Sequence, residues 1–241
     1  MRYEVVIVNM KEISISPYAI TFLLAFIVSF AIVFILLSKR GIPANYIGYS
    51  MFLNVVLILY GAKLFTVVTS GFKTSIWNAG FSSLGGAIGL LLGIFIFGCM
   101  YKEGRSALFE SYITVLPLMY SVSKIGCYLV GCCHGIPYSG PFAVSYSGDY
   151  IQGGPYFPVQ LVESVTFACI FLVIFFLYMR GNRKHLIPTV MILCAITKFS
   201  LDYLREYHLS KIISANQLVC IIFFVWGILA IYKKRKGAQE T

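Results

Sequence analysis

The sequence is poor in charged residues, and above all in acidic ones. Only 12% of its 241 residues are charged, with nine Asp and Glu against 19 Lys and Arg, while 59% are hydrophobic. Such a composition excludes an ordinary water-soluble domain and indicates a membrane protein. The chain also lacks internal repeats, low-complexity tracts and any separate soluble stretch, so we expect a single transmembrane domain over residues 1–241.

The apolar residues form runs of about 20, the length that crosses roughly 30 Å of hydrocarbon as a helix. Unbroken runs of this kind are not the alternating ten-residue strands of a membrane β-barrel. The sequence therefore predicts an all-α, polytopic membrane protein with about seven transmembrane helices. The predicted spans are 17–38, 46–69, 82–101, 107–130, 158–179, 187–205 and 213–232.

The Lys and Arg residues between these spans are unevenly divided. Eleven fall on the side that holds residues 39–40, 102–105, 180–184 and 233–236, five fall on the other side, and three lie inside spans. Because cytoplasmic loops carry the excess of Lys and Arg, the N-terminus is predicted outside and the C-terminus in the cytoplasm. The formal net charge of +10 is then mostly a topological signal, and we expect no nucleic-acid partner.

Three lysines, Lys63, Lys124 and Lys198, interrupt apolar runs. A cation at the bilayer centre costs roughly 2.5–3.5 kcal/mol, so such residues usually face a polar cavity or an anionic partner. Asp202 and Arg205 follow Lys198 at helical spacing, which places all three on one face if the helix continues. An intramembrane anion site is the leading hypothesis, and an internal salt-bridge ladder that only stabilises the bundle is the alternative.

The acids Glu110 and Glu163 lie near span ends and are expected to join this site, where they would orient the cations or take a proton. Gly85 and Gly86 open a glycine-rich stripe in the third span. Small residues of this kind pack helices closely, and the pair could also admit a ligand.

Seven cysteines do not suggest a disulfide framework, because four lie within spans. Cys127, Cys132 and Cys133 instead cluster near the outer end of the fourth span, followed by His134. Zinc ligands are normally spaced, and the adjacent Cys132, Cys133 and His134 are not expected to converge on one tetrahedral ion. We therefore expect a tight turn and no metal site; a cysteine nucleophile that accepts lipid before passing it on is a further alternative.

Four motifs in order resemble those of the bacterial phosphatidylglycerol–prolipoprotein diacylglyceryl transferases. They are GAKLF in the second span, GGAIG opening the third, SKIGCYLVGCCHG ending the fourth, and FPVQLVE entering the fifth with KFSLDYLRE in the sixth. Matched residue by residue, Lys63, Lys124 and Lys198 occupy family arginines. Gly126, Gly131 and Gly135 occupy family glycines, and Gln160, Glu163, Asp202 and Arg205 occupy the family's polar positions.

The resemblance implies transfer of a diacylglyceryl group from phosphatidylglycerol to the lipobox cysteine of prolipoproteins, forming a thioether without cofactor, metal or covalent enzyme intermediate. Its partners would be phosphatidylglycerol, prolipoprotein signal peptides and membrane lipid, in the inner (plasma) membrane of a bacterial cell. Lys124 and Lys198, supported by Lys63 and Arg205, would bind the phosphate, while Asp202 and Glu163 hold these cations. Gly85, Gly86, Gly126, Gly131 and Gly135 would allow close approach.

The chain departs from the family pattern at several positions. Lysine replaces arginine three times, Cys127 replaces an asparagine, Cys132 replaces a glutamate, and Leu84 stands where the family has a histidine. His134 is therefore the candidate base, with Glu163 as the alternative. The alternative functions are a related transferase with another acceptor, and a non-catalytic protein that binds or transports an anionic lipid.

Overall fold

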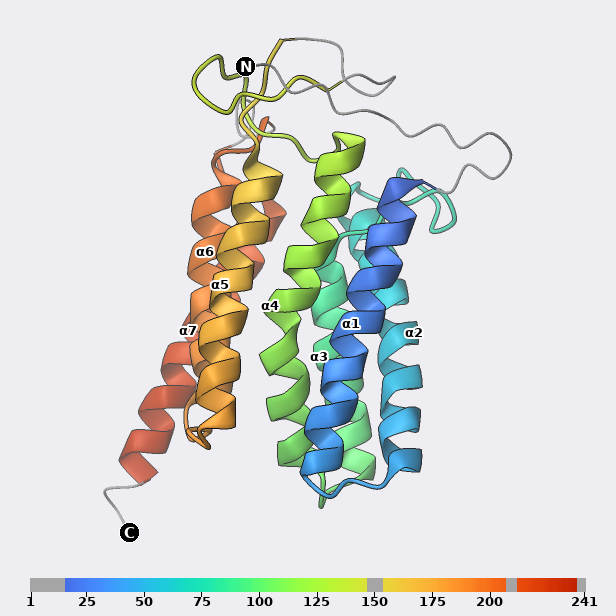
Figure 1. The fold of residues 1–241 in the computed structure, drawn as a ribbon, viewed down its shortest axis with the longest axis vertical. Helices are drawn as coiled ribbons and strands as arrows, with labels where there is room; N and C mark the ends of the chain where they lie inside the picture. The colour runs from blue at the N-terminus through green and yellow to red at the C-terminus, as the bar shows by residue number, and fades with distance from the viewer. Residues whose placement is uncertain (1–15, 147–153, 207–211, 238–241) are drawn as a thin grey trace. The chain divides into compact units, whose positions relative to one another are not determined.

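The structure, a computed structural model, describes residues 16–146, 154–206 and 212–237 (Figure 1). That part of the chain contains seven helices and, apart from isolated backbone bridges, no strands. The helices are α1 (Pro17–Lys39), α2 (Ala44–Thr69), α3 (Ser83–Met100), α4 (Arg105–Val130), α5 (Val159–Met179), α6 (Leu186–Asp202) and α7 (Ala215–Gly237). The predicted all-α architecture is confirmed; the N-terminus, which is predicted outside, does not belong to the described residues.

Six of these helices are long and apolar enough to cross a membrane, and α6 is the exception. It has 17 residues and ends at Asp202, three residues before the predicted end of the sixth span. The chain turns after Asp202 because residues 204–205 pair with the loop that follows α4: the Ile136 N–H donates to the Leu204 carbonyl over 3.0 Å. Arg205 thus lies on this turn, and the prediction that it continues a helical face was wrong.

The chain divides into two compact units. One comprises Ser29–Leu116, with the second half of α1, α2, α3 and the start of α4. The other comprises Met1–Val28 and Pro117–Thr241, with the first residues of α1, the end of α4, α5, α6 and α7. The expected single domain over residues 1–241 stays a prediction.

In the unit formed by Ser29–Leu116, α2 and α3 pack through glycine. A Cβ on Gly85 would collide with the carbonyl of Gly61, and one on Gly89 would collide with the backbone of Leu57. Gly86 is less crowded, since its Cβ would meet Ile58 and Ala62 at 3.4 Å or more. The predicted glycine contact face is confirmed, and the close neighbours of Gly85 and Gly86 belong to α2.

The same unit holds Glu110, one of the acids expected at the anion site. Its carboxylate accepts hydrogen bonds from Arg40 over 2.7 Å and from Ser106 over 2.8 Å. Deeper in this unit, the hydroxyls of Ser50 and Tyr112 lie 2.9 Å apart. Glu110 therefore has a partner of its own, at the turn between α1 and α2.

In the unit that contains Pro117–Thr241, the loop between α4 and α5 folds over the helix ends. Tyr156 exchanges two backbone hydrogen bonds with Val144, and the Phe157 N–H donates to the Ile136 carbonyl over 3.0 Å. In Figure 1 this loop lies at the end of the unit where α4 and α6 finish and α5 begins. These three helix ends carry the charged residues that the sequence singled out.

The start of α7 lies at the same end and is fixed by a capping box. The Ser214 hydroxyl accepts a hydrogen bond from the Gln217 N–H, and the Gln217 side chain accepts one from the Ser214 N–H. This reciprocal pair satisfies two donors that a helix start leaves free. It also holds the Ser214 side chain in place for a further contact.

A matched pair of substitutions tests the α2–α3 packing. Gly89→Ala places a methyl group against the α2 backbone and should cost about 1–3 kcal/mol of stability, as overpacking usually does. Gly86→Ala should have little effect, because its Cβ meets ordinary contact distances. Thermal unfolding of both variants in detergent measures this; equal midpoints would contradict the packing described for Gly89.

Candidate functional site

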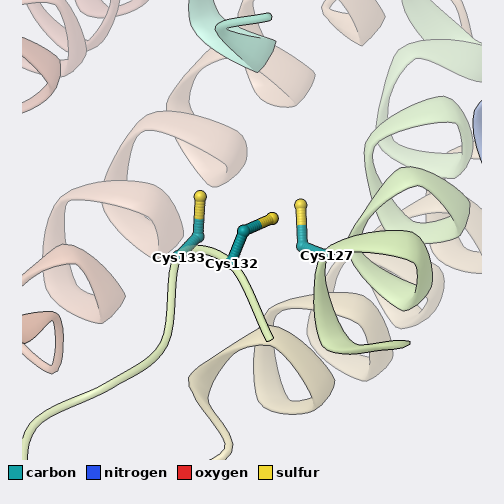
Figure 2. A group of neighbouring side chains, drawn as sticks. All are labelled: Cys127, Cys132 and Cys133. Carbon is teal, nitrogen blue, oxygen red and sulfur yellow. The ribbon is translucent and has the colours of Figure 1, made fainter. Parts of the chain in front are cut away.

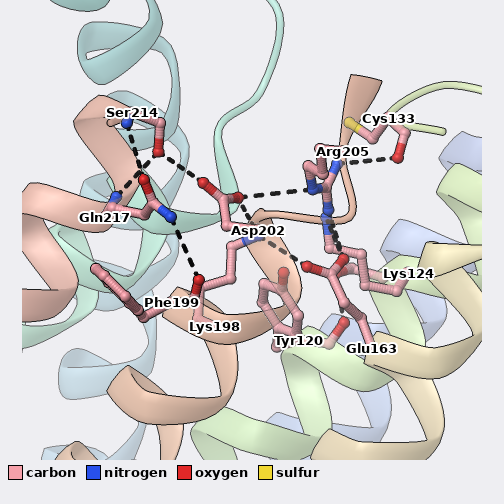
Figure 3. Close-up of polar contacts among 11 residues, drawn as sticks. Tyr120, Lys124, Cys133, Glu163, Lys198, Phe199, Asp202, Arg205, Ser214 and Gln217 are labelled. Carbon is pink, nitrogen blue, oxygen red and sulfur yellow. Dashed lines mark hydrogen bonds and ion pairs between the residues drawn. The ribbon is translucent and has the colours of Figure 1, made fainter. Parts of the chain in front are cut away.

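The centre of the site is the buried carboxylate of Glu163, near the start of α5 (Figure 3). One of its oxygens accepts a 2.8 Å hydrogen bond from the Lys198 ammonium. The other contacts the Arg205 guanidinium and lies 3.5 Å from the Lys124 ammonium. One carboxylate thus joins cations from the end of α4, from α6 and from the turn after α6.

A second carboxylate, that of Asp202, completes the group. One oxygen accepts from Lys198 over 3.2 Å and lies 3.7 Å from Arg205 Nε. The other accepts from the Ser214 hydroxyl over 2.6 Å, so the capped start of α7 anchors it. We refer to Lys124, Glu163, Lys198, Asp202 and Arg205 as the charged cluster.

Every member of the charged cluster is buried. Lys124, Lys198 and Arg205 are 4%, 6% and 4% exposed, and Glu163 and Asp202 are not exposed at all. Among the described residues, three cations face two carboxylates, which leaves a net charge of +1. A buried charge that lacks a counter-ion is strongly unfavourable, so this site is suited to an anion.

Several donors around the cluster have capacity left for a ligand. Lys124 contacts one Glu163 oxygen at 3.5 Å and the face of the Tyr120 ring at 4.9 Å. The Tyr120 hydroxyl and Arg205 Nε are buried and have no hydrogen-bond partner among the described residues. An ammonium, a hydroxyl and a guanidinium N–H are the donors that phosphate oxygens accept from.

A turn that follows α4, Gly131–Gly135, closes one side of the cluster. The Cys133 carbonyl accepts from Arg205 over 2.9 Å, and the Cys132 carbonyl accepts from the Gln160 side chain over 3.0 Å. Gln160 also accepts from the Tyr146 hydroxyl. Burial raises the pKa of Tyr146 to about 12, so this hydroxyl keeps its proton and donates.

Of the three glycines at this end of the unit, Gly126 and Gly135 lie against other segments, and Gly131 has a positive φ. Gly131 ends α4 with a φ of +73°, which glycine adopts without strain. A Cβ on Gly135 would lie 2.5 Å from the Phe157 carbonyl and 2.9 Å from that of Leu204, and one on Gly126 would collide with Thr21 of α1. These close approaches are between segments of the protein itself.

The thiols of Cys127, Cys132 and Cys133 converge beside this turn (Figure 2). Their sulfur atoms all lie within 4.8 Å of one another. Hydrogen bonds from the other two thiols, together with the charges of Lys124 and Arg205, lower the pKa of Cys133, whereas the same thiol contacts raise the pKa of Cys132. The expectation that Cys132, Cys133 and His134 do not share one ion stays a prediction, because the group that the structure brings together contains Cys127 in place of His134.

His134, the candidate base, is held at the rim. Its Nε2 lies 3.3 Å from the exposed carboxylate of Glu206, and its ring packs 4.4 Å from that of Tyr156. It follows Cys133, whose carbonyl binds Arg205. The structure thus places His134 beside the turn, and its contacts in the described part of the chain are with the loop and Glu206.

Lys63, expected to support the phosphate site, belongs to the other unit. There its ammonium donates to the carbonyls of Ile76 and Trp77 over 3.2 and 3.0 Å and lies 5.4 Å from the Phe81 ring. These contacts hold the loop between α2 and α3 against α2. A role in phosphate binding stays a prediction for Lys63.

Sequence reasoning missed Tyr120, Ser214 and Gln217. Tyr120 precedes Lys124 by four residues and so shares its helical face, a spacing that could have indicated it. The capping-box pattern Ser-x-x-Gln at residues 214–217 was likewise visible. No sequence signal indicated that Ser214 also contacts Asp202.

Fold and site together define a multi-pass helical membrane protein with a buried, net cationic site. The chain belongs to the prolipoprotein diacylglyceryl transferase family, whose model matches residues 5–233. This membership makes it a transferase of that kind. The family resemblance noted from the motifs is confirmed.

Curated relatives agree with this assignment. The phosphatidylglycerol–prolipoprotein diacylglyceryl transferase 2 of Clostridium perfringens is 28% identical over 86% of this chain and 88% of its own length. The enzyme of the same name from Chlamydia pneumoniae is 26% identical over 73% and 69%. That of Psychrobacter arcticus is 20% identical over 99% and 96%.

Removing the central carboxylate should destabilise the protein. Glu163→Gln leaves three buried cations around a neutral amide, and breaking a buried ion pair in this way costs about 3–5 kcal/mol. Glu206→Gln changes an exposed carboxylate and should stay within about 0.5 kcal/mol of the parent. Chemical unfolding in detergent compares the two; equal stability would show that the charged cluster does not need Glu163.

Proposed function

We propose that this protein transfers the diacylglyceryl group of phosphatidylglycerol to the lipobox cysteine of prolipoproteins. Family membership and the names of the curated relatives support this reaction. The observation that carries the proposal is the buried net charge of +1, with donors on Lys124, Arg205 and Tyr120 free to bind a phosphodiester. Phosphatidylglycerol carries one negative charge at its phosphate, which matches this excess.

Each residue of the charged cluster has a proposed role. Lys124, Lys198 and Arg205 bind the phosphate, and their charge stabilises the phosphate that leaves. Glu163 and Asp202 hold the three cations in place. Glu163 contacts all three of them, and Asp202 contacts Lys198 and Arg205. Tyr120, stacked against both Lys124 and Lys198, donates its free hydroxyl to the same phosphate.

The reaction requires a thiolate. The sulfur of the acceptor cysteine attacks the glycerol carbon bonded to the phosphate, the carbon–oxygen bond breaks, and glycerol-1-phosphate leaves with that electron pair. His134 is the proposed proton acceptor because it lies at the rim of the site and remains partly exposed. Glu163 suits this role less well, since three cations engage its oxygens.

The proposed setting is the inner membrane of a bacterial cell, with seven spans in one domain, the N-terminus outside and the C-terminus cytoplasmic. As a seventh span, α6 would rise about 26 Å at 1.5 Å per residue, and the turn after it would supply the remaining length. Prolipoprotein signal peptides would reach the site from the outer side. The excess of Lys and Arg in the opposite loops supports this orientation.

Reporter fusions test the orientation. A fluorescent protein fused after Thr241 should fold and fluoresce, whereas alkaline phosphatase at the same point should stay inactive, because the C-terminus is cytoplasmic in the proposed topology. Active phosphatase at this position would reverse the orientation.

The reaction is tested with purified protein, labelled phosphatidylglycerol and a synthetic lipobox peptide. Transfer to the peptide is expected, and none to a peptide whose cysteine is changed to serine. Lys124→Ala should lower the rate by about 10²–10³-fold, the usual effect of losing one donor to a developing oxyanion. Lys124→Arg should retain most of the activity, because it keeps the charge and restores the arginine that the family pattern has at this position.

Lys73→Ala is the matched control, since Lys73 is an exposed lysine of the loop between α2 and α3. It should leave the rate unchanged. Folded parent protein that shows no transfer, or a Lys124→Ala variant with full activity, would contradict the proposed function.

A further inference from the structure

The proposed reaction leaves one cluster of reactive side chains without a role. Cys127 lies in the last turns of α4, and Cys132 and Cys133 lie in the turn that follows it. Figure 2 shows Cys132 between the other two, with the three sulfur atoms on the same side of the turn. All three cysteines are free, and their sulfur atoms lie within 4.8 Å of one another.

The backbone is shaped to bring these thiols together. Cys133 has a φ of +59°, a left-handed conformation that is uncommon for a residue with a side chain. Hydrogen bonds hold it there: Arg205 donates to the Cys133 carbonyl and Gln160 donates to the Cys132 carbonyl. Unusual backbone geometry that several contacts maintain is typical of functional sites.

We propose that Cys127, Cys132 and Cys133 bind a zinc ion whose fourth position takes the thiol of the acceptor cysteine. Thiolates about 2.3 Å from a tetrahedral zinc ion lie roughly 3.8 Å apart, so the sulfur atoms need to move by about 1 Å. Three protein ligands with one open position are the arrangement of catalytic zinc sites. The inference rests on the proposed transferase function, which supplies a thiol as the acceptor.

Charge and accessibility agree with this assignment. Zinc with three thiolates has a net charge of −1, which the neighbouring cations Lys124 and Arg205 favour. Cys127 is buried, Cys132 is partly exposed and Cys133 is exposed. One side of the site is therefore covered by protein, and an incoming peptide would approach from the side of the exposed residue Cys133.

The turn also places the two sites next to each other. Cys127 follows Lys124 by three residues on α4, and Arg205 contacts the Cys133 carbonyl. A thiol bound beside Cys133 is therefore close to a phosphate bound by Lys124 and Arg205. The carbon that the sulfur must attack is bonded to that phosphate through one oxygen.

The zinc ion would supply the thiolate. On binding, the acceptor thiol would lose its proton to His134 at the rim of the site, since a thiol that coordinates zinc is deprotonated. Its sulfur then forms the bond to the glycerol carbon with one electron pair, and the carbon–oxygen bond gives its pair to the leaving glycerol-1-phosphate. No electrons are gained or lost by the metal.

Metal content is the first test. Full-length protein in detergent, exposed to zinc and exchanged into metal-free buffer, should retain about one zinc per chain by mass spectrometry. The triple variant with Cys127→Ser, Cys132→Ser and Cys133→Ser should lose at least about 90% of it. Cys169→Ser, which changes an exposed cysteine of α5, is the control and should retain the metal.

Cobalt in place of zinc tests the open position, because its spectrum reports the ligands. The parent protein should show a thiolate-to-cobalt charge-transfer band that grows when the lipobox peptide is added, and the peptide with serine should not change it. A parent protein that binds no metal, a triple variant that binds as much, or cysteines found as a disulfide in the purified protein would each overturn the inference.

The transfer assay separates this inference from the proposed function. Zinc-loaded protein should transfer at least about 10-fold faster than protein stripped by a chelator, and added zinc should restore the rate. Equal rates in both states would overturn the zinc role and leave the transferase function intact. No transfer in either state, from protein whose cobalt spectrum responds to the peptide, would contradict the transferase function and retain the metal site.

Discussion

The contact of Glu163 with three cations is the interaction on which the rest of the site depends. Lys124, Lys198 and Arg205 come from three separate segments, and each would be costly to bury alone in an apolar bundle. The Glu163 carboxylate gives each of these three cations a negatively charged partner. Because Asp202 adds only one further negative charge, the cluster is held together and still has a charge of +1 for a ligand.

This constraint explains much of the surrounding structure. The helix α6 ends at Asp202, so that Arg205 can turn back to Glu163 and to the Cys133 carbonyl. Ser214, fixed by the capping box of α7, donates a hydrogen bond to Oδ2 of Asp202. Gly135 permits the backbone of the turn to approach the carbonyls of Phe157 and Leu204. The loop after α4, the turn after α6 and the starts of α5 and α7 thus lie around the charged cluster.

Sequence reasoning predicted the helices well, because apolar runs of membrane length leave few alternatives. It also predicted four members of the charged cluster, Lys124, Lys198, Asp202 and Arg205, from cations and acids that stand out in such runs, and Glu163 from its position near a span end. Tyr120 was missed because an aromatic residue is ordinary in a membrane helix. The convergence of three thiols depends on the positive φ of Cys133, which the residue type does not indicate.

The central claim is that the charged cluster binds the phosphate of the lipid substrate. The most direct measurement is the affinity of the detergent-solubilised protein for phosphatidylglycerol and for the diacylglycerol that lacks its headgroup, in the parent and in Lys124→Arg and Lys124→Ala. The account predicts tighter binding of phosphatidylglycerol by the parent and by Lys124→Arg, and loss of that preference in Lys124→Ala. Equal affinity for the two lipids in the folded parent protein would contradict it.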